Sequence, residues 1–183
     1  MKKAFVIVVS SILMFTMTAM SPLGTIPVLR LIPYPPVPDC VYYPIDYEGY
    51  MYPLRPGMRE WAKLDSNMQM LAAVQIPEGI LAGMSTKVIA QSAACYPKLG
   101  DMILFGSNKM GFEAVFTNAN VLQALSKRED AREELQALLE DKNWVAAGKY
   151  PWGYNPAYVT IILQAEEFGG EGLPDEWWEV IDS

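Results

Sequence analysis

The sequence predicts a mainly α-helical protein, a compact array of short helices that follows an extended, Pro/Tyr-rich N-terminal arm. Three observations support this prediction. From Met58 to about Asn143, apolar residues recur at the three- and four-residue spacing of helices. Residues that favour helix N-caps precede several of these stretches. Nine of the 14 prolines lie between Ser21 and Gly57, where they disfavour both helices and central strands.

These observations divide the chain into four parts. Residues 1–20 are a signal peptide or an N-terminal membrane anchor, and residues 21–57 form the extended arm. Residues 58–143 form the helical domain. Residues 144–183 are an aromatic, acidic C-terminal extension that we expect to pack on the helical domain.

The N-terminus has the pattern of a secretory signal. Lys2 and Lys3 precede an apolar run, Ala4–Met20, which contains no charge, proline or glycine. We therefore expect an exported protein that is periplasmic, at the cell surface or secreted. Cleavage of this run and its retention as a membrane anchor both stay open, because it is slightly shorter than the roughly 20 residues that span a bilayer.

The arm is rich in tyrosine as well as proline. Its six tyrosines are Tyr34, Tyr42, Tyr43, Tyr47, Tyr50 and Tyr52. Proline-rich segments adopt extended conformations and lose little entropy on binding, so one interpretation is a docking surface for a partner. The other interpretation is an arm that lies across its own domain or spaces it from the membrane. Short arms more commonly take this second arrangement.

Four short helices are predicted between residues 58 and 97, the first over Met58–Leu64. The next three begin at residues that suit a helix N-terminus, namely Asp65 or Ser66, then Pro77, then Ser85 with Thr86. The second helix carries an apolar stripe of Met68, Leu71 and Val74. One face of the fourth carries Val88, Ile89, Ser92, Cys95 and Tyr96. Tyr96-Pro97 ends this helix, since the residue before a proline disfavours the helical conformation.

A short helical piece, Met102–Phe105, precedes the longer helices of the domain. Gly106-Ser107-Asn108 is a turn that contains a capping residue, and a break is expected at Asn118-Ala119-Asn120. The apolar stripes around this break are Phe112, Val115 and Phe116, then Leu122 and Leu125. The last helix, Glu129–Lys142, is strongly amphipathic. Its buried stripe is Ala131, Leu135, Leu138 and Leu139.

The C-terminal extension begins with an aromatic loop around Gly148, Pro151 and Gly153. Asn155-Pro156 then suits the start of a helix. The run Tyr158–Leu163 has both the spacing of a helix and the composition of a strand, so both assignments stay open. Pro174 begins a last short helix that carries Trp177 and Trp178.

The central stretch contains short motifs that resemble a known module. They are Trp61-Ala62-Lys63-Leu64, Gln75-Ile76-Pro77-Glu78-Gly79-Ile80-Leu81, Met84-Ser85-Thr86, Tyr96-Pro97, Gly111-Phe112-Glu113-Ala114-Val115 and Arg128-Glu129-Asp130-Ala131. Over residues 61–139 the chain resembles a helical module of uncharacterised exported bacterial proteins. The resemblance implies a helical fold and export, and it implies no catalytic residue.

The composition excludes several classes of function. Histidine is absent, which removes Ser-His-Asp and Cys-His catalysis together with the usual zinc sites. No acidic segment has the spacing of an EF-hand. The formal net charge of −7 argues against nucleic acid as a partner, because binding to phosphates needs a positive surface. We therefore expect no metal, no cofactor and no nucleic acid.

The two cysteines, Cys40 and Cys95, allow two interpretations. In an oxidising compartment they would form a disulfide that pins the arm to the helical domain. Alternatively, Cys95 is a small apolar residue of the buried helix face, which is common for a cysteine without a disulfide.

The C-terminal aromatic residues are the best candidates for a binding site. They are Trp144, Trp152, Tyr154, Trp177 and Trp178. Tryptophan and tyrosine are enriched where proteins bind partners, although these residues would also serve to cover the helical core. The leading hypothesis is an exported, non-enzymatic interaction or structural domain at the bacterial envelope, with an unknown protein or envelope component as partner. The alternative is a carboxylate-dependent hydrolase that acts on envelope polymers or glycans.

Overall fold

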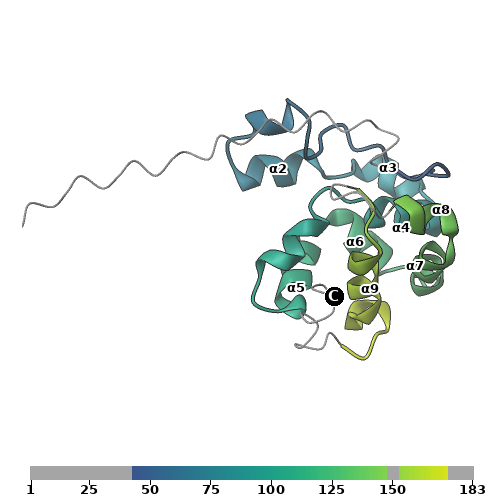
Figure 1. Cartoon of the computed structure of the whole chain (residues 1–183). Coiled ribbons are helices and arrows are strands. Elements are labelled where there is room, and N and C mark those ends of the chain that lie inside the picture. Colours follow the sequence, from purple (N-terminus) through teal and green to yellow (C-terminus); the bar gives the residue numbers. More distant parts are fainter. Residues whose placement is uncertain (1–42, 148–152, 173–183) are drawn as a thin grey trace, which may run out of the picture. The chain divides into compact units, whose positions relative to one another are not determined.

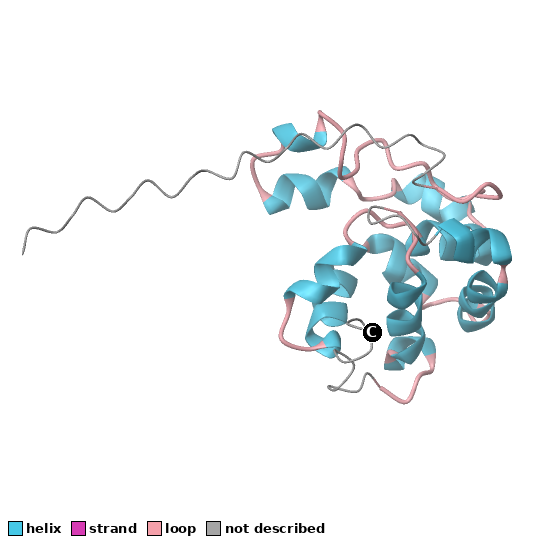
Figure 2. Cartoon of the chain, in the orientation of Figure 1, coloured by secondary structure: helices cyan, strands magenta, loops and turns pink. Residues whose placement is uncertain are grey.

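The computed structural model describes residues 43–147 and 153–172 (Figure 1). Every regular element in these two ranges is a helix, and neither range contains a strand (Figure 2). This confirms the predicted mainly α-helical array of short helices. Residues 1–42, 148–152 and 173–183 lie outside the described ranges, and with them the predicted signal segment and the first part of the predicted arm.

The described helices are short, and the longest of them is α5 with 11 residues. In chain order the elements are η1 (Trp61–Lys63), α2 (Asn67–Ala73), α3 (Glu78–Gly83), α4 (Thr86–Ala94), η2 (Leu99–Leu104), α5 (Asn108–Asn118), α6 (Asn120–Leu125), α7 (Ala131–Glu140), α8 (Lys142–Ala147), α9 (Pro156–Gln164) and η3 (Glu166–Phe168). Isolated helices of this length are unstable in water, so tertiary packing must hold them. In the described ranges, no helix has both the length and the apolar character that crossing a membrane requires.

Four helix starts are capped by the side chains that the sequence indicated. Ser66, Ser85 and Ser107 accept hydrogen bonds from the backbone N–H three residues later, at the starts of α2, α4 and α5. Asn155 accepts one from the N–H of Ala157, and Pro156 occupies the first turn of α9. The run Tyr158–Leu163 is therefore helical rather than extended.

Two predicted helical segments form 3₁₀ elements, and their bounds differ from those predicted. In place of a helix over Met58–Leu64, only the 3₁₀ turn η1 forms, and none of its residues is buried. Gly57 precedes it with a positive φ of 92°, and Leu64 follows it in an extended conformation, so little chain is left for an α-helix. The piece predicted at Met102–Phe105 overlaps a longer 3₁₀ element, η2, which begins at Leu99 and ends at Leu104, before the extended Phe105.

The core is built around α4. Seven of its nine residues are buried, so this helix is surrounded by other elements instead of lying at the surface. Ala90, Ala93 and Ala94 are among them, and small side chains allow neighbouring helices to approach closely. Helix α4 packs against α6 and α7. Helix α9 packs against both α5 and α7 and lies between them in Figure 1.

Helix α5 and η2 approach each other through Gly111. A Cβ atom at this position would lie 2.0 Å from the carbonyl oxygen of Met102, which is far inside van der Waals contact. Only glycine permits this packing, because the opposing atom belongs to the backbone and has little freedom to move. The contact fixes the position of η2 relative to α5, and with it the surface that these two elements present.

The described part of the arm, residues 43–57, has no regular element and is bonded to α4. The backbone N–H of Glu48 donates to Oε1 of Gln91 at 2.7 Å, and that of Tyr50 donates to Oγ of Ser92 at 2.8 Å. The hydroxyl of Tyr52 donates to the carbonyl oxygen of Ser92 at 2.9 Å. Side chains of the buried helix α4 thus accept hydrogen bonds from backbone N–H groups of the arm. In a β-strand, such groups would instead be bonded to a neighbouring strand.

The end of the described chain is held in place by η3 and its neighbours. Nη1 of Arg132 on α7 donates to the carbonyl oxygens of Leu163 at 2.7 Å and Phe168 at 3.0 Å. After η3 the chain reverses, and the N–H of Gly172 donates to the carbonyl oxygen of Gln164 at 3.1 Å. Gly169 and Gly172 have positive φ angles of 71° and 99°, which glycine adopts without strain.

Candidate partner-binding surface

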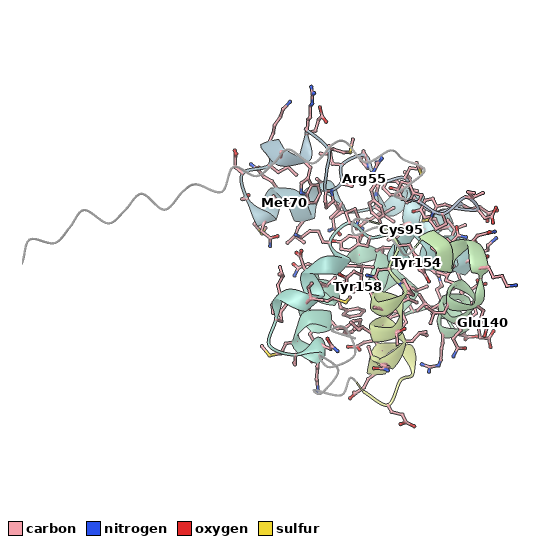
Figure 3. All side chains as sticks on the ribbon, in the orientation of Figure 1. Arg55, Met70, Cys95, Glu140, Tyr154 and Tyr158 are labelled. Carbon is pink, nitrogen blue, oxygen red and sulfur yellow. The ribbon has the colours of Figure 1, made fainter. Side chains whose placement is uncertain are left out.

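Two of the predicted binding residues lie in the core. Trp144 and Tyr154 are 1% and 0% exposed, and their rings meet edge to face with centroids 5.0 Å apart. Tyr47 of the arm lies against Trp144, at a centroid distance of 6.1 Å. Figure 3 shows Tyr154 and Cys95 among the crowded side chains of the interior. These two aromatic residues therefore offer almost no surface to a partner, and they join the arm, α8 and the C-terminal extension to the core.

The other three predicted binding residues, Trp152, Trp177 and Trp178, lie outside the described residues. The same is true of Cys40. Cys95 is buried, and burial raises the pKa of its thiol well above the ordinary value, an effect that the N–H of Tyr154 partly opposes. The Cys40–Cys95 disulfide stays a prediction.

A different apolar surface is exposed at the end of η2. Ile103, Leu104 and Phe105 follow one another in the chain, and each is exposed, Leu104 by 76%. We call these three residues the apolar edge. A single exposed apolar side chain is normal in a soluble protein, whereas three in succession form a patch that water solvates poorly.

The apolar edge adjoins a small hollow in the surface, which we call the α2–α5 hollow. Its volume is about 100 Å³, and Phe105 forms part of its wall. The other lining residues are Asn67 and Leu71 of α2, Lys98 and Asp101, and Ala114, Val115 and Asn118 of α5. Leu71, Phe105, Ala114 and Val115 thus form the apolar half of the lining, and the other half is polar or charged. Sites for small organic ligands enclose roughly 300–1,000 Å³, so this hollow suits one or two side chains of a partner instead.

The polar end of the α2–α5 hollow is a partly buried ion pair. Nζ of Lys98 lies 2.5 Å from Oδ2 of Asp101, and the Lys98 side chain is only 9% exposed. A lysine this buried is stable only when its charge is matched, and Asp101 supplies the match. The nearby phenol of Tyr158 has a raised pKa, mainly because of burial and also because of the Asp101 carboxylate. The opposite charges of Lys98 and Asp101 neutralise each other, so this part of the hollow carries almost no net charge.

A second hollow of about 100 Å³ lies between α5 and the chain around η3, and we call it the α5–η3 hollow. Its floor contains Phe112 and Ala165. Around them stand Lys109, Glu113, Glu166, Glu167 and Gly172. The three glutamates are exposed to water. Nowhere in residues 43–147 and 153–172 do three metal-ligating side chains gather closely enough to hold a metal ion.

Sequence reasoning missed both hollows and the apolar edge. The sequence predicts a short helix over these residues, and their local pattern does not indicate whether the side chains face the core or the solvent. One signal was present, because the Ile-Leu-Phe run stands directly before the turn Gly106-Ser107 and turns lie at the surface. Comparison of the chain with protein-family models, with curated proteins and with solved structures gives no match.

Proposed function

We propose that this chain is an exported, non-enzymatic interaction domain of the bacterial envelope, and that it binds a protein partner through the apolar edge and the α2–α5 hollow. The observation that carries the proposal is the succession of Ile103, Leu104 and Phe105 on the surface beside a partly apolar hollow. Burial of such a patch against a partner removes apolar surface from water, which is the main driving force of association.

The surface is also held rigidly, which lowers the entropy that binding must overcome. Gly111 brings η2 into backbone contact with α5, and Ser107 caps α5 directly after the edge. Lys98 and Asp101 neutralise each other at the polar end. We therefore expect a partner that presents apolar side chains from a helix or an extended segment, with few charges opposite the hollow.

Export is the first part of the proposal and rests on the N-terminal sequence. Fusion of residues 1–30 to a reporter that is active only outside the cytoplasm tests it. We expect activity that is lost when Lys2, Lys3 and the apolar core of Ala4–Met20 are replaced by polar residues. An inactive reporter, with the fusion intact, would rule out export.

Partner binding is tested with a photo-crosslinking amino acid at position 104 of the full chain in its native envelope. We expect adducts with a discrete protein that disappear when Phe105→Glu places a charge in the hollow wall. The same crosslinker at exposed position 136 on α7 serves as the matched control. A binding role for this surface is excluded if positions 104 and 136 give the same adducts, or if Phe105→Glu leaves the adducts at 104 unchanged.

A second candidate function draws on the α5–η3 hollow. Glu113, Glu166 and Glu167 stand around it, and a pair of carboxylates is the catalytic equipment of most glycoside hydrolases. The general acid of such an enzyme normally lies in an apolar setting, whereas these three side chains are exposed. The hydrolase proposal requires that the purified chain release sugars from envelope glycans, and that Glu113→Gln or Glu166→Gln abolish the release.

A further inference from the structure

The α2–α5 hollow places an apolar wall beside a polar end. Phe105 is 37% exposed, and Leu71 and Ala114 are half-buried, so all three offer apolar surface to a group that enters the hollow. The volume of about 100 Å³ leaves room for one ring beside these side chains. Contact between such a ring and this wall removes the apolar surface of both from water.

The polar end of the hollow carries hydrogen-bond acceptors whose capacity is unused. Nδ2 of Asn118 donates to the carbonyl oxygen of Ala114 at 2.8 Å, which leaves Oδ1 of this amide for another donor. Nζ of Lys98 pairs with Oδ2 of Asp101, which leaves Oδ1 of the carboxylate. Within residues 43–147 and 153–172, neither Oδ1 atom accepts a hydrogen bond. Asn118 is exposed, and the Asp101 side chain is 36% exposed, so both acceptors are accessible.

Donors are scarcer than acceptors at this end. The ammonium group of Lys98 belongs to a side chain that is only 9% exposed and is already paired with Asp101. The amide group of Asn67, at the start of α2, adds both a donor and an acceptor. The balance therefore favours a ligand group that donates a hydrogen bond over one that only accepts.

The charge of the polar end favours a donor that is itself neutral. Lys98 and Asp101 already neutralise each other, so an entering cation would lose hydration without gaining a free counter-charge. An entering carboxylate would bring acceptors to acceptors. A neutral N–H or O–H group loses far less on leaving water, and it satisfies one of the two Oδ1 atoms.

We propose that the partner anchors itself in the α2–α5 hollow with the side chain of a tyrosine or a tryptophan. The ring packs on Leu71 and Phe105, and the phenol O–H or indole N–H donates to Oδ1 of Asn118 or Asp101. These two residue types combine an apolar ring with one neutral donor, and they are enriched among the residues that dominate binding energy. The inference rests on the proposed function, because it names the group with which a partner would occupy that same surface.

The test measures binding of single amino-acid amides to the ¹⁵N-labelled full chain by NMR. The probes are N-acetyl-tyrosinamide and N-acetyl-phenylalaninamide, which differ only in the hydroxyl donor. We expect the tyrosine probe to shift the amide signals of Leu71, Phe105 and Asn118. It should bind about tenfold more tightly than the phenylalanine probe, as one hydrogen bond between neutral groups permits. N-acetyl-tryptophanamide should shift the same signals.

Two variants assign the preference to the polar end of the hollow. Asn118→Leu removes one acceptor and should reduce the preference for tyrosine over phenylalanine at least threefold. Thr117→Val makes a similar polar-to-apolar change at the adjacent exposed position of α5, outside the hollow, and should leave the preference unchanged. The spectrum of each variant outside the hollow must match that of the parent, which shows that the fold is kept.

Three results would overturn the aromatic anchor. They are equal affinities for the tyrosine and phenylalanine probes, shifts that lie away from the hollow or are absent up to the solubility limit of the probes, and a preference that Asn118→Leu does not change. Crosslinking at position 104 answers a separate question. Protein adducts at 104 without binding of the tyrosine probe would keep the partner-binding surface and remove only its aromatic anchor.

Discussion

Gly111 shows how one residue without a side chain determines a contact between two elements. Its missing Cβ leaves room for the carbonyl group of Met102, and α5 and η2 meet there. In the adjacent pair Gly111-Phe112, the first residue allows a close backbone contact because it has no side chain. The second residue fills the core with a buried ring. Gly79 on α3 is different, because a Cβ there would meet no atom within 4 Å.

Gly111→Ala is therefore expected to destabilise the fold severely, whereas Gly79→Ala is expected to be neutral or stabilising. The first forces backbone atoms apart and should cost about 3 kcal/mol or more. The second removes a flexible residue from a helix and should add up to about 1 kcal/mol. Chemical denaturation of the two variants and the parent measures both. Equal midpoints for Gly111→Ala and Gly79→Ala would contradict the observed packing.

The pairing of Cys40 with Cys95 is a second prediction at the scale of residues. The proposed export would expose both thiols to an oxidising compartment, and Cys95 lies at the end of α4, to which the described part of the arm is bonded. Mass spectrometry of protein taken from its native compartment and alkylated without reductant detects the bond. Two alkylated cysteines in that sample would show that the arm is held without a disulfide.

At the scale of elements, α7 illustrates how an amphipathic pattern becomes a buried face. Leu135 and Leu138 are buried as expected, Leu139 is half-buried, and Gln136 on the opposite side is exposed. The acids Glu133 and Glu134 occupy its first turn, where the helix dipole favours negative charge. This helix packs against α4, α8 and α9.

Leu135→Ala or Leu138→Ala should each cost about 2–5 kcal/mol of unfolding free energy, because each leaves a cavity in a packed interior. Gln136→Ala on the same helix is the control and should stay within about 0.5 kcal/mol of the parent. Denaturation curves of the three variants and the parent give these differences in unfolding free energy. If the leucine variants unfold with the parent, the face of α7 has been assigned wrongly.

At the scale of the whole molecule, buried tyrosines link stability to pH. Burial raises the pKa of Tyr43, Tyr96 and Tyr154 well above 10.0, the ordinary value for tyrosine. Tyr43 comes from the arm, Tyr96 from the end of α4 and Tyr154 from the C-terminal extension. Ionisation of any of them in the folded state would place a charge in the core that these three parts share.

The sign of the pH effect follows from proton binding. Above about pH 10 the unfolded chain loses its tyrosine protons while the folded chain keeps them, so stability falls as pH rises and is fully present only below that pH. We expect the unfolding free energy to decrease steadily between about pH 10 and 12, together with a cooperative rise in tyrosinate absorbance. Tyr154→Phe should reduce the slope. If the unfolding free energy of this variant falls with pH as steeply as that of the parent, groups other than Tyr154 cause the effect.

Much of the architecture could be predicted from the sequence, because its determinants are local. Ser66, Ser85, Ser107 and Asn155 cap helices through backbone groups only two or three residues away, so the sequence around each is sufficient. The break between α5 and α6 and the amphipathic face of α7 are local in the same sense. The absence of histidine likewise limits the chemistry of the chain without any knowledge of its fold.

The candidate surface could not be predicted in this way, because exposure depends on segments far apart in the chain. Trp144 and Tyr154 have the composition of a binding site but are buried, since Tyr47 of the arm and the core helices surround them. Leu104 and Phe105 have the composition of a core but are exposed, whereas Met102 of the same element is buried where Gly111 of α5 approaches it. By itself, the sequence determined the helical class and several helix starts. Only the tertiary structure decided which apolar residues face water, because the same hydrophobic effect buries or exposes a side chain according to its distant neighbours.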